Sequence, residues 1–128
     1  MSYADLVRAF YDAWTAGDVP AMLALVDPEV EVEPVLGVLY GRESYRGRGD
    51  LEAWFREVSA RWDSFAAHVE RARTRGDAVV AFLRLTGHRG EESFDARIAV
   101  ECHFREGRIL SFRGRDAWEV EEELAIGF

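Results

Sequence analysis

Apolar side chains at helical spacing open the chain. They recur every three or four positions, at Tyr3, Leu6, Val7, Phe10 and Trp14. This stripe predicts an amphipathic helix. Ser2 and Asp5 have the spacing of an N-terminal capping box, in which Asp5 takes the position of the usual, longer Glu or Gln. Gly17 is a common residue at a helix end, so we expect the first helix to lie between Ser2 and Gly17.

Shorter patterns follow this helix. A second helix is expected from Asp18 to near Asp27-Pro28, because the residue before a proline is pushed out of helical geometry. Alternating glutamate and valine over 29–33 predict a short strand that ends at Pro34, which cannot donate a ladder hydrogen bond. The glycine- and arginine-rich segment 41–50 predicts a loop. A third helix then carries the apolar stripe Leu51, Trp54, Phe55, Val58 and Trp62.

From residue 64 to residue 118 the apolar pattern has period two. Four strand-like runs, at about 64–74, 77–87, 93–106 and 108–118, are joined by short turns, so they are expected to pair as antiparallel neighbours. One face of the third run carries Phe94, Ala96, Ile98, Val100, Cys102 and Phe104, and the other carries Asp95, Arg97, Glu101, His103 and Arg105. The last ten residues read as a weak terminal helix or a tail.

This order of elements predicts one α+β domain spanning residues 1–128. We expect a cone-shaped, curved antiparallel or mixed sheet wrapped over three helices, with an internal apolar cavity. Cavities of this kind are the default sites for small ligands.

Composition excludes several function classes. The formal charge of −8 argues against a dedicated nucleic-acid binder, which usually has a basic face. The single cysteine, Cys102, rules out an internal disulfide framework and fits a reducing compartment. Because no apolar run reaches the length of a membrane span and no signal-peptide pattern opens the chain, we expect a cytoplasmic protein without a membrane partner. No metal-ligand spacing links the three histidines to one another or to Cys102.

Several segments together resemble a known family. They are YDAWTAGDVPAMLALVDPEVEVEPVLG, GRESYRGRGDLEAWF, the step WDSF and FREGRILSF. In this order they are similar to SnoaL-like proteins, part of the ketosteroid-isomerase and nuclear transport factor 2 fold group. The resemblance implies a cone-shaped α+β barrel, often a homodimer packed through the outer face of the sheet. The family spans isomerases, polyketide cyclases, epoxide hydrolases, dehydratases and proteins without a known reaction, so the fold alone does not settle function.

The resemblance also implies roles for single residues. In isomerase-like members a carboxylate base precedes a proline at the end of the first strand, and Glu33 matches that position, with Glu31 as a possible second acid. Their oxyanion hole uses a tyrosine on the first helix and a protonated acid on a later strand. Phe10 and Val100 align there, and neither can donate a hydrogen bond. Tyr11 is expected to point about 100° away around the helix, which weakens the case for isomerisation.

Other interpretations of these residues stay open. Glu33 is also compatible with an exposed glutamate at the strand end, like Glu29, or with an acid that pairs with Arg42 or Arg46. Arg42, Arg46 and Arg48 are candidates for binding a ligand carboxylate. The epoxide-hydrolase branch uses an Asp-Arg-Asp set, which matches Asp95, Arg97 and Asp116 by type. A bulge would be needed to turn Asp95 and Arg97 toward the cavity.

We therefore predict a cofactor-independent, metal-free domain that binds a small apolar or mixed-polarity metabolite. The expected ligand contacts are Phe10, Trp14, Trp54, Phe55, Val100, Cys102, Phe104 and Phe112. If the protein is an enzyme, Glu33, with Glu31, would transfer protons in an isomerisation, cyclisation, hydration or dehydration. The alternatives are a non-catalytic ligand-binding domain and a homodimeric structural domain that uses the outer face around Arg97, Glu101 and His103.

Overall fold

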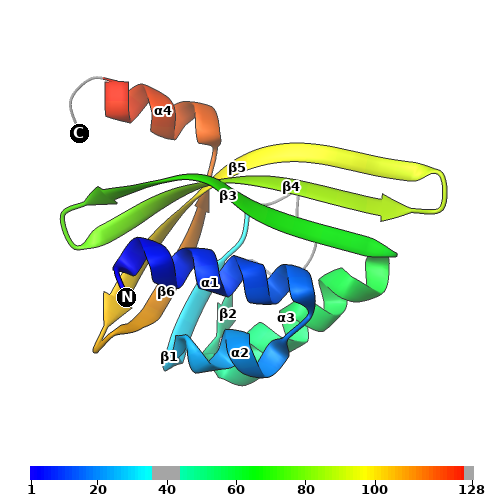
Figure 1. Ribbon diagram of the computed structural model, residues 1–128, viewed down its shortest axis with the longest axis horizontal. Helices are drawn as coiled ribbons and strands as arrows, with labels where there is room; N and C mark the ends of the chain where they lie inside the picture. The colour runs from blue at the N-terminus through cyan, green and yellow to red at the C-terminus, as the bar shows by residue number, and fades with distance from the viewer. Residues whose placement is uncertain (36–43, 126–128) are drawn as a thin grey trace.

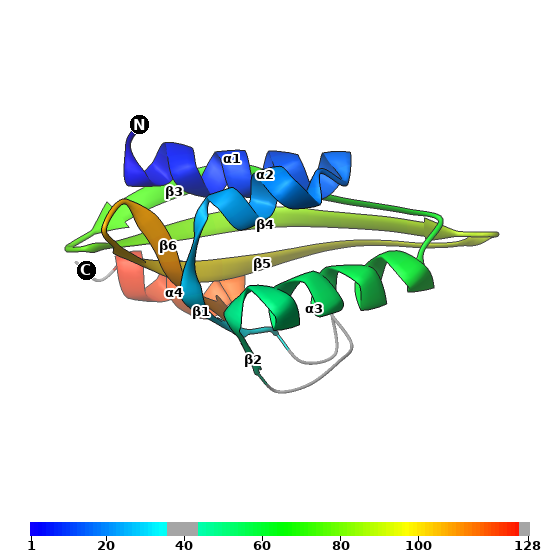
Figure 2. The same ribbon diagram turned by 90° about the horizontal axis from the view of Figure 1, so that it is seen from below.

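One curved, unclosed six-stranded sheet organises the molecule, with helices on both of its faces (Figures 1 and 2). The computed structural model describes residues 1–35 and 44–125. Three helices, α1, α2 and α3, lie on one side of the sheet, and α4 lies on the other. The predicted α+β class and the mixed sheet are confirmed.

Helix α1 runs from Tyr3 to Ala16. Its N-terminus is a capping box: the Ser2 hydroxyl accepts from the Asp5 amide at 3.1 Å, and the Asp5 carboxylate accepts from the Ser2 amide at 3.2 Å. Gly17 ends the helix in the left-handed conformation, with φ 72°, which glycine adopts without steric cost. The predicted first helix is confirmed at both ends.

The second helix is shorter than predicted. Helix α2 spans Val19–Ala24 and strand β1 spans Val26–Glu33, so Asp27 belongs to the sheet. The Asp27 carboxylate is held there by the Arg105 guanidinium, with Nε–Oδ2 at 3.0 Å and Nη2–Oδ1 at 2.7 Å. This pairing with Arg105 lowers the pKa of Asp27 and anchors the start of β1 to a distant strand. The strand ends before Pro34, as predicted.

The predicted loop at 41–50 is partly structured. Strand β2 consists of Tyr45–Arg46, and helix α3 spans Gly47–Arg61, so the helix starts earlier than its apolar stripe indicated. The Asp50 carboxylate accepts from the Arg46 amide at 3.1 Å and supports the first turn.

The four long strands of the sheet follow. They are β3 (Ser64–Arg75), β4 (Ala78–Arg89), β5 (Glu92–Arg105) and β6 (Arg108–Arg115). Neighbours in this group are antiparallel, as predicted, and β1 pairs in parallel with β6. The order across the sheet is β2-β1-β6-β5-β4-β3.

The C-terminal residues form helix α4, from Ala117 to Ala125. The last strand therefore ends before residue 118, because Asp116 caps the helix by accepting from the amides of Trp118 and Glu119 at 2.9 and 3.1 Å. Val120 of α4 is fully buried against Val80, Phe82 and Ala99 on the outer face of the sheet. Within the described ranges, no helix is both long enough and apolar enough to cross a membrane.

Candidate functional site

A cavity lies between helices α1 and α3 and the inner face of the sheet. Its wall is almost entirely apolar and draws on five strands and two helices. The lining residues are Tyr11, Trp14, Val32, Glu33, Pro34, Val35, Trp54, Phe65, Ala67, Leu83, Leu85, Ile98, Val100, Phe112 and Gly114.

The cavity is narrow. It encloses about 410 Å³ of atom-free space, including the part open to solvent, but a water-sized sphere can be centred in only about 30 Å³ of it. That inner space holds roughly two water molecules. A larger ligand must displace side chains or extend into the open part.

The rim lies where the chain leaves β1. Glu33, Pro34 and Val35 are less buried than the deep wall, and Gly114 faces them from β6. A Cβ atom at position 114 would lie 2.6 Å from Val35 Cγ2 and 2.7 Å from the Val35 amide nitrogen, too close for any side chain. Gly114 is thus required for this close crossing of β6, which brings Glu33 to the rim.

Tyr11, not Phe10, lines the cavity, which corrects the expected orientation of the first helix. Tyr11 is 8% exposed, and burial, with a smaller contribution from the neighbouring Cys102, raises the pKa of its hydroxyl well above 10.0. Phe10 instead packs in the core against Phe112, with ring centroids 4.5 Å apart. The spacing of Val7, Tyr11 and Trp14 fits one helical face and was the available signal for Tyr11.

The structure separates the eight predicted ligand contacts into two groups. Trp14, Trp54, Val100 and Phe112 line the cavity. Phe10, Phe55, Cys102 and Phe104 are absent from its wall: Phe55 packs edge-on against Trp14, and Phe104 stacks on Tyr3 with centroids 4.0 Å apart. Cys102 is fully buried, and burial raises the pKa of its thiol.

Glu31 and Glu33 alternate with buried Val30 and Val32, so their side chains leave the face that carries the core. The Glu33 carboxylate lies 3.7 Å from Arg113 Nε, and its side chain is 58% exposed. Glu31 lies 3.4 Å from Arg46 and is half exposed. The catalytic role of both acids stays a prediction from the family resemblance.

The arginines of the 41–50 segment have other contacts. Arg46 pairs with Glu31, as just described, and Arg48 donates from Nη2 to the Val26 carbonyl oxygen at 2.7 Å. Arg42 lies outside the described residues.

The Asp-Arg-Asp set does not reach the cavity. The pairing of β4 with β5 runs without a bulge through Asp95 and Arg97, so alternation keeps both side chains on the outer face. Asp95 accepts from Arg84 Nε at 3.0 Å, which lowers the pKa of Asp95, and Arg97 donates to Glu70 at 2.9 Å. Asp116 caps α4. The inward-turning bulge that this interpretation required is absent from β5.

Side chains of the types that bind metals are dispersed in the part of the chain that the structure describes. No three His, Cys, Asp or Glu side chains there form a metal-binding group. His68, His88 and His103 lie on three different strands, and His103 Nε2 contacts the Glu101 carboxylate at 3.0 Å.

Comparison with known families identifies the chain. The profile of the SnoaL-like domain matches residues 7–123. The chain belongs to the SnoaL-like domain family. Its sequence matches none of the curated proteins with which it was compared.

Solved structures share the fold of this SnoaL-like domain. A ketosteroid isomerase-like protein from Catenulispora acidiphila, in complex with trimethylamine, is 20% identical, with a TM-score of 0.76 over 88% of this chain and 85% of that one. A putative polyketide cyclase from Sinorhizobium meliloti is 16% identical, with a TM-score of 0.72 over 87% and 94%. TerC, co-crystallised with polyporic acid, is 15% identical, with a TM-score of 0.78 over 97% and 98%.

Proposed function

We propose that this SnoaL-like domain binds a small, mostly apolar molecule in the cavity under α1 and α3. The observation that carries the proposal is the composition of the wall. Aliphatic and aromatic side chains from both layers converge there, while Tyr11 and Trp54 supply its uncharged polar groups. Apolar pockets with a few polar groups are typical ligand sites.

The position of Glu33 favours binding over proton transfer as the main activity. A general base must come within hydrogen-bond reach of the proton it removes. The Glu33 carboxylate is more than half exposed and lies beside Arg113, so a ligand deep in the cavity would meet Tyr11 rather than this acid. Proton transfer remains the second candidate, supported by the place of Glu33 at the rim.

Ligand binding is also a documented use of this fold. TerC was crystallised with polyporic acid and the Catenulispora acidiphila protein with trimethylamine. These ligands belong to those proteins. For this chain, the apolar wall favours a molecule whose bulk is hydrocarbon.

A cavity-filling substitution tests the proposal. Ala67 lies on β3, is 2% exposed and lines the cavity, so Ala67→Leu places additional bulk in the ligand space. Ala66→Leu is the matched control, because Ala66 precedes it on β3 and faces the other side. A library of small apolar compounds would be screened by urea unfolding. A ligand at a hundred times its Kd is expected to raise the free energy of unfolding by about 2.7 kcal/mol.

The expected result is a hit that stabilises the wild-type protein and the Ala66→Leu control but not Ala67→Leu. Circular dichroism checks that both variants fold. Equal affinity for wild type and a folded Ala67→Leu variant would place the ligand elsewhere, and a library without any stabilising compound would overturn the binding function.

A further inference from the structure

The indole N–H of Trp54 is buried without an acceptor. Trp54 is 6% exposed on α3, and its Nε1 has no hydrogen-bond partner among residues 1–35 and 44–125. Buried donors in native proteins are nearly always hydrogen-bonded, so each exception requires an explanation. Trp54 also lines the cavity, and a ligand there contacts the buried nitrogen once a neighbouring side chain moves aside.

Neighbouring rings offer this donor only a weak substitute. The Trp14 ring lies 4.9 Å away at an interplanar angle of 61°, and the Tyr45 ring lies 5.6 Å away at 31°. An N–H directed at an aromatic face is a second-order interaction compared with one directed at an oxygen. A buried donor left without an acceptor costs free energy, so the indole nitrogen favours a ligand that supplies one.

The charge of the wall limits what that acceptor can be. Among the described lining residues there is no arginine or histidine, and the one charged residue is Glu33 at the rim. A carboxylate in the deep cavity would have no cation to pair with, and an unpaired buried charge is strongly disfavoured. The ligand group must accept a hydrogen bond from the indole and must be uncharged. The oxygen of an uncharged carbonyl group does both.

We propose that Trp54 recognises an uncharged carbonyl group of an otherwise apolar ligand by donating its indole N–H to the carbonyl oxygen. The inference rests on the proposed binding function and adds the chemical class of the ligand. Tyr11 of α1 also lines this cavity.

Three small compounds of similar shape test whether Trp54 recognises a carbonyl group. Acetophenone carries the carbonyl, α-methylstyrene replaces the oxygen by a methylene group of similar shape, and benzoate carries a charge. Their affinities would be measured for wild type, Trp54→Phe and Trp118→Phe. Trp118 is the control because it is 69% exposed on α4, on the opposite side of the sheet. The four indole N–H signals would be followed in proton–nitrogen correlation spectra, with the Trp54 signal assigned from its loss in Trp54→Phe.

We expect wild type to bind acetophenone about tenfold more tightly than α-methylstyrene, and benzoate more weakly than either. The preference should vanish in Trp54→Phe and persist in Trp118→Phe. Acetophenone should move the Trp54 indole proton downfield, and α-methylstyrene should not. Equal affinities for the first two probes, or an unmoved Trp54 signal with acetophenone bound, would overturn the role of Trp54 and leave apolar binding intact. Failure of all three probes to bind would count against the proposed function itself, and the inference would fall with it.

Discussion

At the scale of single residues, the hydroxyl of Tyr11 is the group whose chemistry the fold changes most clearly. Burial against the core disfavours the tyrosinate and raises the pKa of Tyr11 far above its usual range. The side chain stays a neutral hydrogen-bond donor even at a pH where an exposed tyrosine ionises. Because no described lining residue is a cation, that neutrality suits an uncharged ligand.

A pH titration of Tyr11 tests this directly. We expect folded wild type and folded Tyr11→Phe to show the same tyrosinate absorbance at about pH 11, because Tyr11 remains protonated there. Additional tyrosinate in wild type at that pH would show that the hydroxyl is accessible and would contradict the assignment.

The raised pKa of Tyr11 also predicts the direction in which the free energy of unfolding changes with pH. The folded pKa is raised above the unfolded value near 10, so the stabilisation is complete below pH 10 and declines as pH rises from there toward the folded pKa. Urea unfolding above pH 10 should therefore show a steeper loss for wild type than for Tyr11→Phe. Cys102, whose thiol pKa is also raised by burial, is present in both proteins, so the comparison isolates Tyr11 together with its smaller interaction with Cys102.

The same scale shows how far residue positions can be predicted from sequence. Alternation along β1 predicted that Glu31 and Glu33 share one face, as the structure shows, and the structure adds that the face of Val30 and Val32 is the buried one. Tyr11 was predicted to point away from the cavity because the apolar stripe and the family alignment both used Phe10, although the spacing of Val7, Tyr11 and Trp14 fits a helical face equally well. The unpartnered Trp54 nitrogen had no signal in the sequence, because it depends on which groups lie around it in space.

At the scale of elements, the spacing of apolar residues and the helix-capping residues predicted most of the helices and strands. The four long strands and the first helix appear close to where their patterns placed them. The two boundary errors have different causes. Asp27 pairs within the sheet with the distant Arg105, a tertiary contact that the local pattern does not encode. Asp116 ends β6 through a local contact, because it caps α4 by accepting from the amides two and three residues further on.

Helix α4 is the element most dependent on tertiary contacts. It is attached to the outer face by the buried Val120, with Ala117 and Leu124 partly buried beside it, and by ion pairs. Arg71 and Glu121, both exposed, pair at 2.9 Å, and the partly buried Arg115 donates to Glu123 at 2.9 Å. Exposed pairs contribute little and Val120 is fully buried, so we expect the burial of Val120 to contribute most of the attachment.

Truncation of this side chain measures the attachment. We expect Val120→Ala to lower the free energy of unfolding by about 2 kcal/mol, as for other buried large-to-small substitutions, and to speed hydrogen exchange in α4 more than in β4. Glu122→Ala, an exposed change on the same helix, should stay within about 0.5 kcal/mol of wild type. Equal effects of the two substitutions would show that α4 is not anchored through Val120.

At the scale of the whole molecule, the topology could not be predicted from the strand patterns. The pairing of β1 parallel to β6 joins the first strand of the chain to the last, and no local period encodes which strands become neighbours. The family resemblance implied a cone-shaped barrel but did not specify this pairing. This pairing matters for function, because it closes the cavity beside β6 and brings the rim residues onto Gly114.

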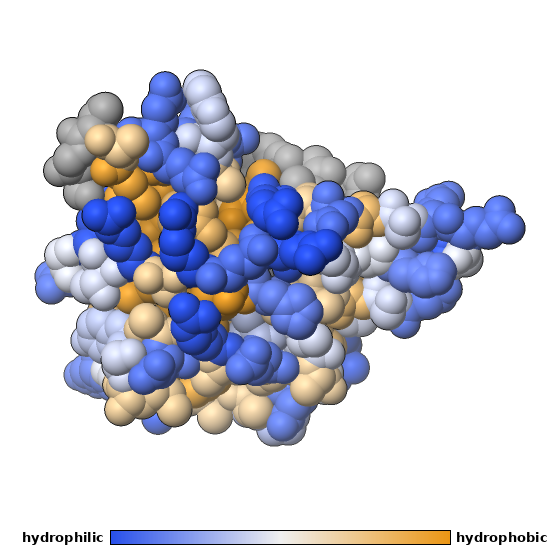
Figure 3. All heavy atoms as spheres, turned by 45° about the horizontal axis from the view of Figure 1, so that its top comes forward, coloured by the Kyte–Doolittle hydropathy of each residue, from blue (hydrophilic) through white to orange (hydrophobic). Residues whose placement is uncertain are grey.

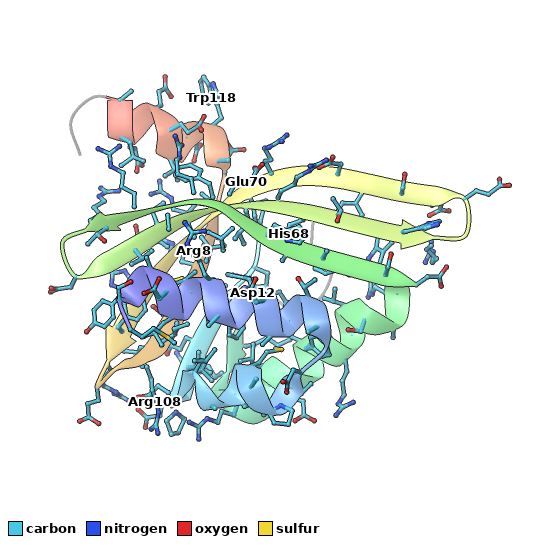
Figure 4. The ribbon with its side chains drawn as sticks, viewed as in Figure 1. Arg8, Asp12, His68, Glu70, Arg108 and Trp118 are labelled. Carbon is cyan, nitrogen blue, oxygen red and sulfur yellow. The ribbon has the colours of Figure 1, made fainter. Side chains whose placement is uncertain are left out.

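The outer face of the sheet remains the surface for the predicted homodimer. Figure 3 looks toward α4 and shows apolar surface interrupted by hydrophilic side chains. Trp118 stands at the start of α4 and points away from the sheet (Figure 4). A groove lined by Glu70, Phe82 and Arg97 lies beside it. A large exposed aromatic next to such a groove is a feature of protein interaction sites.

We therefore expect the wild-type protein to sediment with twice the mass of one chain, and Trp118→Ser to shift the equilibrium toward the monomer because the apolar contact is lost. Glu119→Ser, the adjacent exposed position, controls for changes in α4 itself, and its dimer should persist. Sedimentation equilibrium over a range of protein concentrations measures both. A wild type that is monomeric throughout would show the homodimer prediction to be wrong, whereas a dimer unaffected by Trp118→Ser would move the interface to a different surface. Ligand binding should survive in the Trp118→Ser monomer, because Trp118 is not among the residues that line the cavity.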